Sequence, residues 1–82
     1  MRYFIPHAYE NHSKTTFWVW ESSIECGFWI TNFEDDPCMK VETSSYTLDV
    51  ALRRKADAYW SEVSEVQFLQ SYAGQHFVDV GL

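Results

Sequence analysis

The chain has 82 residues, of which 46% are hydrophobic and 18% aromatic, and twelve carboxylates against six Lys and Arg give a formal net charge of −6. This length allows one domain, over residues 1–82, and the aromatic content allows a packed core without disulfides or a structural metal. The negative charge disfavours DNA, RNA and anionic membranes as direct partners, because each phosphate contact requires a cation.

The first half of the chain predicts short β-strands joined by turns. Residues 2–5 form an apolar run that stops at a proline, and residues 7–14 are polar and predict a loop. β-Branched and aromatic residues predict further strands over residues 15–21, 28–33 and 38–44. The turns between them fall at residues 22–27, where Gly27 is free to take a positive φ, and at residues 34–37. Sequential strands with short turns predict an antiparallel meander.

The second half of the chain predicts helices. Thr47 is a candidate N-cap, and it precedes apolar residues that recur at helical spacing, namely Leu48, Ala51, Leu52, Ala56, Tyr59 and Val63. Residues 64–67 match a capping box, which predicts a second helix ending at Gly74. The alternative is a hairpin of residues 66–70 with residues 76–80, and alternation at residues 77–80 predicts a closing strand. The fold class expected is α+β: a three- to five-stranded antiparallel sheet with one or two helices packed on one face.

Alternation along the strands assigns the large side chains to two faces of the sheet. One face is expected to form the core beneath the long helix and carries Phe17, Val19, Phe28, Ile30, Met39 and Val41. The opposite face carries Trp18, Trp20, Trp29 and Phe33. Because one layer of helix covers only one face, three alternatives stay open for these aromatic residues. The second helix or the N-terminal loop covers them, two copies pair through them, or a different partner binds them.

Residue types suited to metal binding or catalysis occur without the spacing that those chemistries need. The candidate zinc ligands form no Cys-x-x-Cys or His-x₃-His pair; they are His7, His12, His76, Cys26 and Cys38. The acidic neighbours of Cys26 raise the pKa expected for its thiol, which disfavours a reactive thiolate. The chain has no Gly-x-Ser-x-Gly elbow and no glycine-rich phosphate loop. We therefore expect no enzymatic activity, no cofactor and no metal.

Cysteine content and hydropathy bear on the compartment. Two cysteines are too few for a disulfide-stapled domain, the N-terminal residues lack the apolar run of a signal peptide, and no stretch approaches the roughly 20 apolar residues of a membrane span. These features predict a cytoplasmic protein with free thiols. A bridge between Cys26 and Cys38 is the alternative.

The site expected to bind a partner combines the aromatic strand face with the acidic turn beside it. Its residues are Trp18, Trp20, Trp29, Phe33, Glu34, Asp35 and Asp36. Tryptophan buries a large area on a rigid side chain, and the carboxylates would steer the chain towards a basic protein surface. The function expected is a non-enzymatic inhibitor that occupies such a surface, of the type that phages or mobile elements encode against anti-nucleic-acid defences (anti-CRISPR or anti-restriction). The alternatives are an immunity protein against a nuclease toxin and a homodimeric structural or regulatory module.

Overall fold

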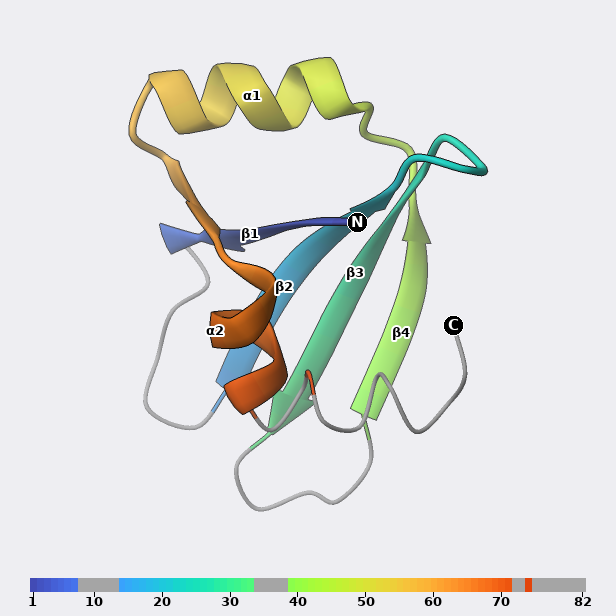
Figure 1. Ribbon diagram of the computed structural model, residues 1–82, viewed down its shortest axis with the longest axis vertical. Helices are drawn as coiled ribbons and strands as arrows, with labels where there is room; N and C mark the ends of the chain where they lie inside the picture. The colour runs from blue at the N-terminus through green and yellow to red at the C-terminus, as the bar shows by residue number, and fades with distance from the viewer. Residues whose placement is uncertain (8–13, 34–38, 72–73, 75–82) are drawn as a thin grey trace.

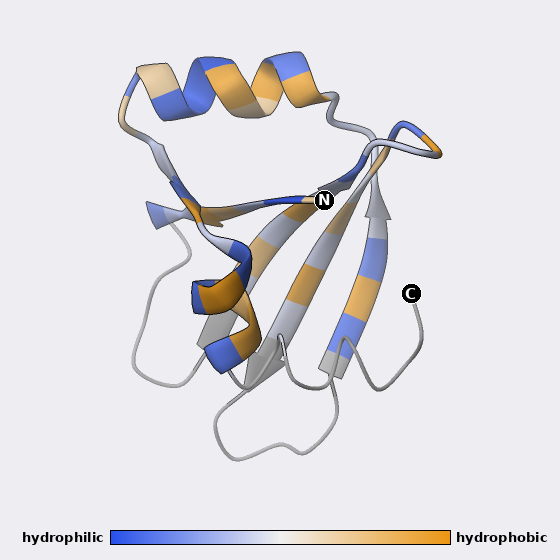
Figure 2. Cartoon of the chain, in the orientation of Figure 1, coloured by the Kyte–Doolittle hydropathy of each residue, from blue (hydrophilic) through white to orange (hydrophobic). Residues whose placement is uncertain are grey.

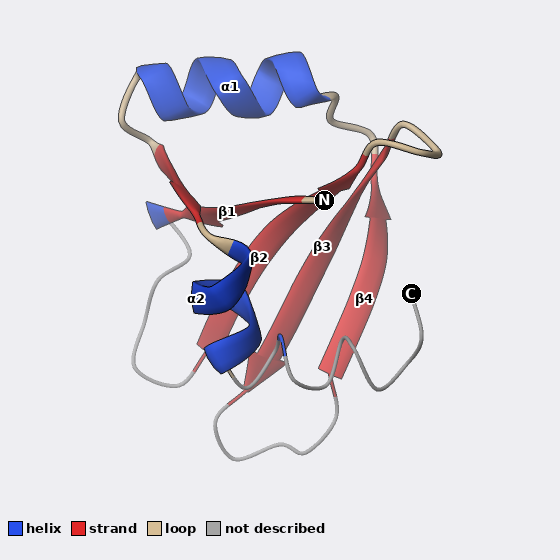
Figure 3. Ribbon diagram, in the orientation of Figure 1, coloured by secondary structure: helices blue, strands red, loops and turns tan. Residues whose placement is uncertain are grey.

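The computed structural model describes residues 1–7, 14–33, 39–71 and 74. In chain order the elements are β1 (Arg2–Pro6), β2 (Lys14–Glu21), β3 (Cys26–Phe33), β4 (Met39–Ser44), α1 (Leu48–Ala56), β5 (Trp60–Val63) and α2 (Glu65–Gln70) (Figure 1). The strands form one antiparallel sheet in the order β4-β3-β2-β1-β5 (Figure 3). The predicted α+β class and the meander of the first four strands are confirmed.

The β2–β3 hairpin sets the register of the sheet. Trp18 lies opposite Trp29, and Phe17 lies opposite Ile30. The predicted turn at residues 22–27 is too long, because Gly27 lies within β3 and the positive φ of 48° falls at Glu25. The turn is held by the carboxylate of Glu21, which accepts hydrogen bonds from the backbone N and Oγ of Ser23 at 3.1 and 2.9 Å.

The long helix is shorter than its apolar spacing predicts. It ends at Ala56, and the chain then reverses at Ala58, whose φ is 63°. Tyr59 N donates to Arg54 O at 2.9 Å, which closes the helix end. The chain continues as β5, which pairs with β1, so the prediction of helix through Tyr59 and Val63 is wrong. The apolar residues beyond Ala56 do not continue the buried stripe of α1, since Tyr59 is 65% exposed and Val63 packs on the cluster around Phe68.

The second helix begins where the capping box predicts it. The hydroxyl Oγ of Ser64 accepts a hydrogen bond from Gln67 N at 3.1 Å. α2 ends at Gln70, with Ser71 as its C-cap, so it is shorter than the predicted helix to Gly74. The predicted turn at residues 34–37 and the predicted strand at residues 77–80 lie outside the described residues.

The two helices pack on opposite faces of the sheet, which corrects the expected placement of the long helix. α1 lies on the tryptophan face, where the buried cluster comprises Phe4, Trp18, Trp20, Ala51 and Trp60. α2 lies on the other face, where the buried cluster comprises Tyr3, Phe17, Val19, Ile30 and Phe68. Figure 1 shows α1 crossing one end of the sheet and α2 in front of it. Figure 2 shows polar and apolar residues alternating along α1 and β4, as elements with one buried face require.

The path of the chain explains why α1 covers the tryptophans. β4 lies at one edge of the sheet and β5 at the other, so the connection between them has to cross a face of β3, β2 and β1. α1 forms that connection, and its apolar residues Leu48 and Leu52 pack on the cluster around Trp18.

Candidate functional site

The structure divides the predicted partner-binding residues into three groups. Trp18 has 0% and Trp20 has 9% of its surface exposed, so both are core residues beneath α1 and the expectation that they face a partner is corrected. Trp29 is only half-buried and remains available to a ligand. Phe33 ends β3, but its side chain lies outside the described part of the chain, as do Glu34, Asp35 and Asp36.

Trp18 is fixed in the core by specific contacts. Its indole Nε1 donates a hydrogen bond to the hydroxyl of Ser44 at 3.0 Å. Its ring stacks on Trp20 with 5.9 Å between centroids, and Phe4 meets it edge-on at 5.7 Å. Trp18 is therefore a central core residue of the sheet face that also carries the accessible aromatic residues.

A pocket of about 420 Å³ opens next to this cluster, and we call it the aromatic pocket. Its lining residues are His7, Trp29, Tyr46, Arg54, Ala58, Tyr59 and Trp60. Three of the rings contact one another: the centroid of Trp29 lies 5.8 Å from that of Tyr46 and 5.7 Å from that of Trp60. The rim is accessible, since Tyr46 is 36% and Tyr59 65% exposed.

Arg54 supplies the charge of the aromatic pocket. Its guanidinium carbon lies 5.2 Å from the ring centroid of Tyr46 and 5.6 Å from that of Trp60, which is cation–π geometry. The Arg54 Nε atom is enclosed and has no hydrogen-bond acceptor among the described residues. His7 also lines the pocket. Its backbone N donates to Tyr59 O at 3.0 Å, and its ring Nε2 lies 2.7 Å from the hydroxyl of Ser61. The pocket is therefore an aromatic enclosure around one arginine.

A second, acidic cleft lies between the β2–β3 turn and the start of α1. It has a volume of about 550 Å³ and is lined by Trp20, Ser22, Glu25, Thr47, Leu48 and Asp49. Its two carboxylates belong to exposed residues, and no Lys or Arg is in the described lining. Hydrogen bonds from Ser23 lower the pKa of the carboxyl group of the neighbouring Glu21. The cleft thus presents negative charge beside the edge of a buried tryptophan.

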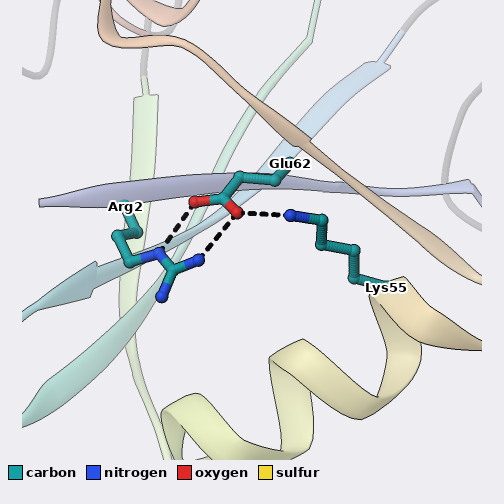
Figure 4. A network of polar contacts seen from close by, with 3 residues as sticks. All are labelled: Arg2, Lys55 and Glu62. Atoms are coloured by element: carbon teal, nitrogen blue, oxygen red, sulfur yellow. Dashed lines mark hydrogen bonds and ion pairs between the residues drawn. The ribbon is translucent and has the colours of Figure 1, made fainter.

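An ion network on the sheet face that α1 covers stabilises the fold. Glu62 accepts two hydrogen bonds from Arg2 and one from Lys55, all at 2.8 Å (Figure 4). The bonds from Arg2, and then the one from Lys55, lower the pKa of the Glu62 carboxyl group to about 2 against the opposing effect of burial. The network ties β1, β5 and the end of α1 together.

Several residues of the aromatic pocket were missed by sequence reasoning. Tyr46, Tyr59 and Trp60 flank the helix at its two ends, and Arg54 lies within it. The fold brings them together, since the ring centroids of Tyr46 and Trp60, from opposite ends of α1, lie 6.2 Å apart. Reading residues 48–63 as one helix placed Tyr59 on a continuous apolar stripe and so concealed it.

Comparisons with known proteins identify no relative of this chain. No protein-family model matches the chain, and neither a curated protein nor a solved structure matches it.

The described residues bear on metal binding, thiol chemistry and membrane insertion. Within residues 1–7, 14–33, 39–71 and 74, no three His, Cys, Asp or Glu side chains are grouped so that they could hold a metal ion. Cys26 is a half-buried free thiol, so the alternative of a bridge to Cys38 is not realised. None of the described helices is long and apolar enough to cross a membrane.

Proposed function

We propose that this protein is a non-enzymatic binding protein that occupies a basic surface of a protein partner through its acidic cleft. The observation that carries the proposal is that Glu25 and Asp49 lie in one concave site with Leu48 and the edge of the largely buried Trp20. Carboxylates beside an apolar floor suit an arginine or lysine side chain, whose charged head needs an anion and whose stem packs on apolar surface.

Charge and shape both support this proposal. The net charge of −6 steers a basic surface towards the chain and raises the rate of encounter. Ile24, on the turn that forms one wall of the cleft, is 62% exposed and extends the apolar contact beyond the carboxylates.

The finer proposal is that the partner is an enzyme or effector complex that acts on nucleic acid. Such proteins carry grooves lined with Lys and Arg, and an acidic chain that fills the groove blocks access of the phosphate backbone. In this view the protein is an inhibitor, of the kind that phages and mobile elements direct against host defence, and it acts in the cytoplasm.

The test compares two variants that change the net charge equally. Glu25→Lys with Asp49→Asn alters the acidic cleft, whereas Glu42→Lys with Asp57→Asn alters exposed carboxylates elsewhere. Each tagged protein is used to capture partners from a lysate of the cells in which it occurs, and captured proteins are identified by mass spectrometry. We expect a partner with a basic groove to be retained by the control and to bind at least about tenfold more weakly to the cleft variant.

Equal retention by both variants would show that the cleft is not the docking surface. Sedimentation of the purified protein tests the homodimer alternative separately. A stable dimer at low micromolar concentration that the cleft substitutions dissociate would assign the same surface to self-association and overturn the proposal.

A further inference from the structure

We infer that the aromatic pocket binds a small organic anion, in which a carboxylate or phosphate group is attached to a flat ring. This inference goes beyond the binding of a protein partner and does not rest on it, because the aromatic pocket and the acidic cleft share none of their described lining residues. The ligand class follows from the charge, the rings and the size of the pocket.

The charge of the pocket is positive although the chain is acidic. Arg54 is the single Lys or Arg in the described lining, and no carboxylate is present there. Among the other described cations, Arg2 and Lys55 pair with Glu62, and Lys40 pairs with Glu42 at 2.9 Å, whereas Arg54 forms no ion pair with a described carboxylate. In a chain with a net charge of −6, this arginine provides a local site for an anion.

The position of Arg54 also excludes a cationic ligand. Aromatic pockets of this kind often take cations over the ring faces, but here the guanidinium itself lies over Tyr46 and Trp60. A second cation would meet a like charge at the place where the rings attract it most. A guanidinium that lies over aromatic rings keeps its terminal N–H donors, and their planar arrangement matches the two oxygens of a carboxylate or phosphate.

The remaining walls are suited to a flat apolar body. Trp29 and the exposed Tyr59 offer ring surface beside Arg54, and rings of a ligand stack on or meet such surfaces edge-on. A volume of about 420 Å³ lies within the range of roughly 300–1,000 Å³ that small-molecule sites occupy. One ring system with an anionic group therefore fits the pocket.

The experiment uses ligands that share a ring and differ in charge. Benzoate, benzamide and benzylammonium form one set, and adenosine 5′-monophosphate, adenosine and inorganic phosphate form the other. Binding to the full chain is followed by the NMR signals of the tryptophan indole N–H groups. We expect the ring-bearing anion of at least one set to bind about tenfold or more tightly than its neutral analogue, as charge-assisted hydrogen bonds require. Which set responds distinguishes a carboxylate from a nucleotide phosphate.

Three variants locate the site. Arg54→Gln should abolish the preference for the anion, whereas Arg53→Gln, at the neighbouring exposed arginine outside the pocket, should leave it unchanged. Tyr59→Ala should weaken binding of ring-bearing anions several-fold, and since this side chain is 65% exposed the variant keeps its core even if Arg54→Gln does not fold. The inference is overturned if no anion binds at millimolar concentration, if neutral analogues bind equally well, or if Arg53→Gln and Tyr59→Ala have the same effect. Retention of the captured protein partner does not depend on any of these outcomes.

Discussion

Gly27 lies against the indole ring of Trp18, so closely that a Cβ atom at this position would lie 2.7 Å from Trp18 Cε2. The glycine is required for space and not for backbone conformation, since it pairs with Trp20 in the regular ladder of β3. This contact lets Trp18 lie flat beneath α1 and reach Ser44 with its indole nitrogen. The packing of Trp18 on the aromatic face of the sheet therefore requires that residue 27 has no Cβ atom.

Gly27→Ala should lower the free energy of unfolding by about 1–3 kcal/mol, because the added methyl group overpacks the site and displaces the Trp18 ring. Urea denaturation followed by circular dichroism measures the loss. The matched background is Trp18→Phe, whose smaller ring no longer occupies the space next to residue 27. In that background Gly27→Ala should cost much less, and an equal cost in both backgrounds would contradict the assigned contact.

Glu62 should make stability fall in acid over a defined pH range. Because the folded-state pKa is lowered from 4.5 to about 2, the stabilisation is complete above pH 4.5 and is lost as the pH falls towards 2. Glu62→Gln should cost about 1–2 kcal/mol at neutral pH, since this half-buried carboxylate accepts hydrogen bonds from two cations. It should also flatten the pH dependence of the melting temperature between pH 4.5 and 2. Glu42→Gln, which removes an exposed ion pair with Lys40, should change little.

Ala58→Gly should stabilise the protein by about 0.5–1 kcal/mol. Ala58 adopts a φ of 63° at the end of α1, a conformation in which a Cβ atom is unfavourable and glycine is preferred. Ala56→Gly is the control and should lower the stability, because this exposed residue is the last of the helix. Glycine in a helix costs about 0.5–1 kcal/mol. Thermal melts of the two variants should shift in opposite directions, and a shared direction would argue against the left-handed residue.

The two helix N-caps should respond differently to alanine. Ser64→Ala removes the hydrogen bond to Gln67 N and should cost about 1 kcal/mol. Thr47 occupies the same position in α1 but its side chain makes no capping hydrogen bond, so Thr47→Ala should cost at most a few tenths of a kcal/mol. Chemical denaturation of both variants tests the difference, and a larger loss at Thr47 would be inconsistent with this geometry.

Phe68 should be the main anchor of α2 on the sheet. Its side chain is fully buried, stacks on Tyr3 with 4.4 Å between centroids and meets Phe17 edge-on at 5.0 Å. Phe68→Ala should therefore cost about 3–5 kcal/mol in a denaturant titration. Val66→Ala, in the same helix but 65% exposed, is the control and should change stability by less than about 0.5 kcal/mol. A small effect at Phe68 would mean that α2 does not need its aromatic contact to stay on the sheet.

Local signals in the sequence were sufficient for strands β1 to β4 and for the start of each helix, but not for β5. Alternation and β-branched residues place β2 within one residue of its observed start, and Ser64 marks the first turn of α2 through its own side chain. These features depend on residues close together in the chain. They can be read before the tertiary fold is known.

The helix placement and the site depend on distant contacts, and for that reason the sequence predicts them poorly. Trp18 and Trp29 are adjacent in register and alternate identically, yet one is buried under α1 and the other reaches the aromatic pocket. Their burial differs because α1, which crosses the sheet from β4 to β5, covers Trp18 and leaves Trp29 half-buried. Arg53 and Arg54 are neighbours of the same residue type, so the sequence does not tell them apart. In the structure Arg54 lies over the rings of Tyr46 and Trp60.

The place of β1 between β2 and β5 has a consequence for synthesis on the ribosome. The N-terminal strand pairs with residues 60–63, so its second edge stays unpaired until most of the chain has been made. Until α1 follows β4, the rings of Trp18 and Trp20 also lack their cover. A nascent chain that stalls before residue 60 therefore exposes an open strand edge and an aromatic surface together, the combination that promotes aggregation.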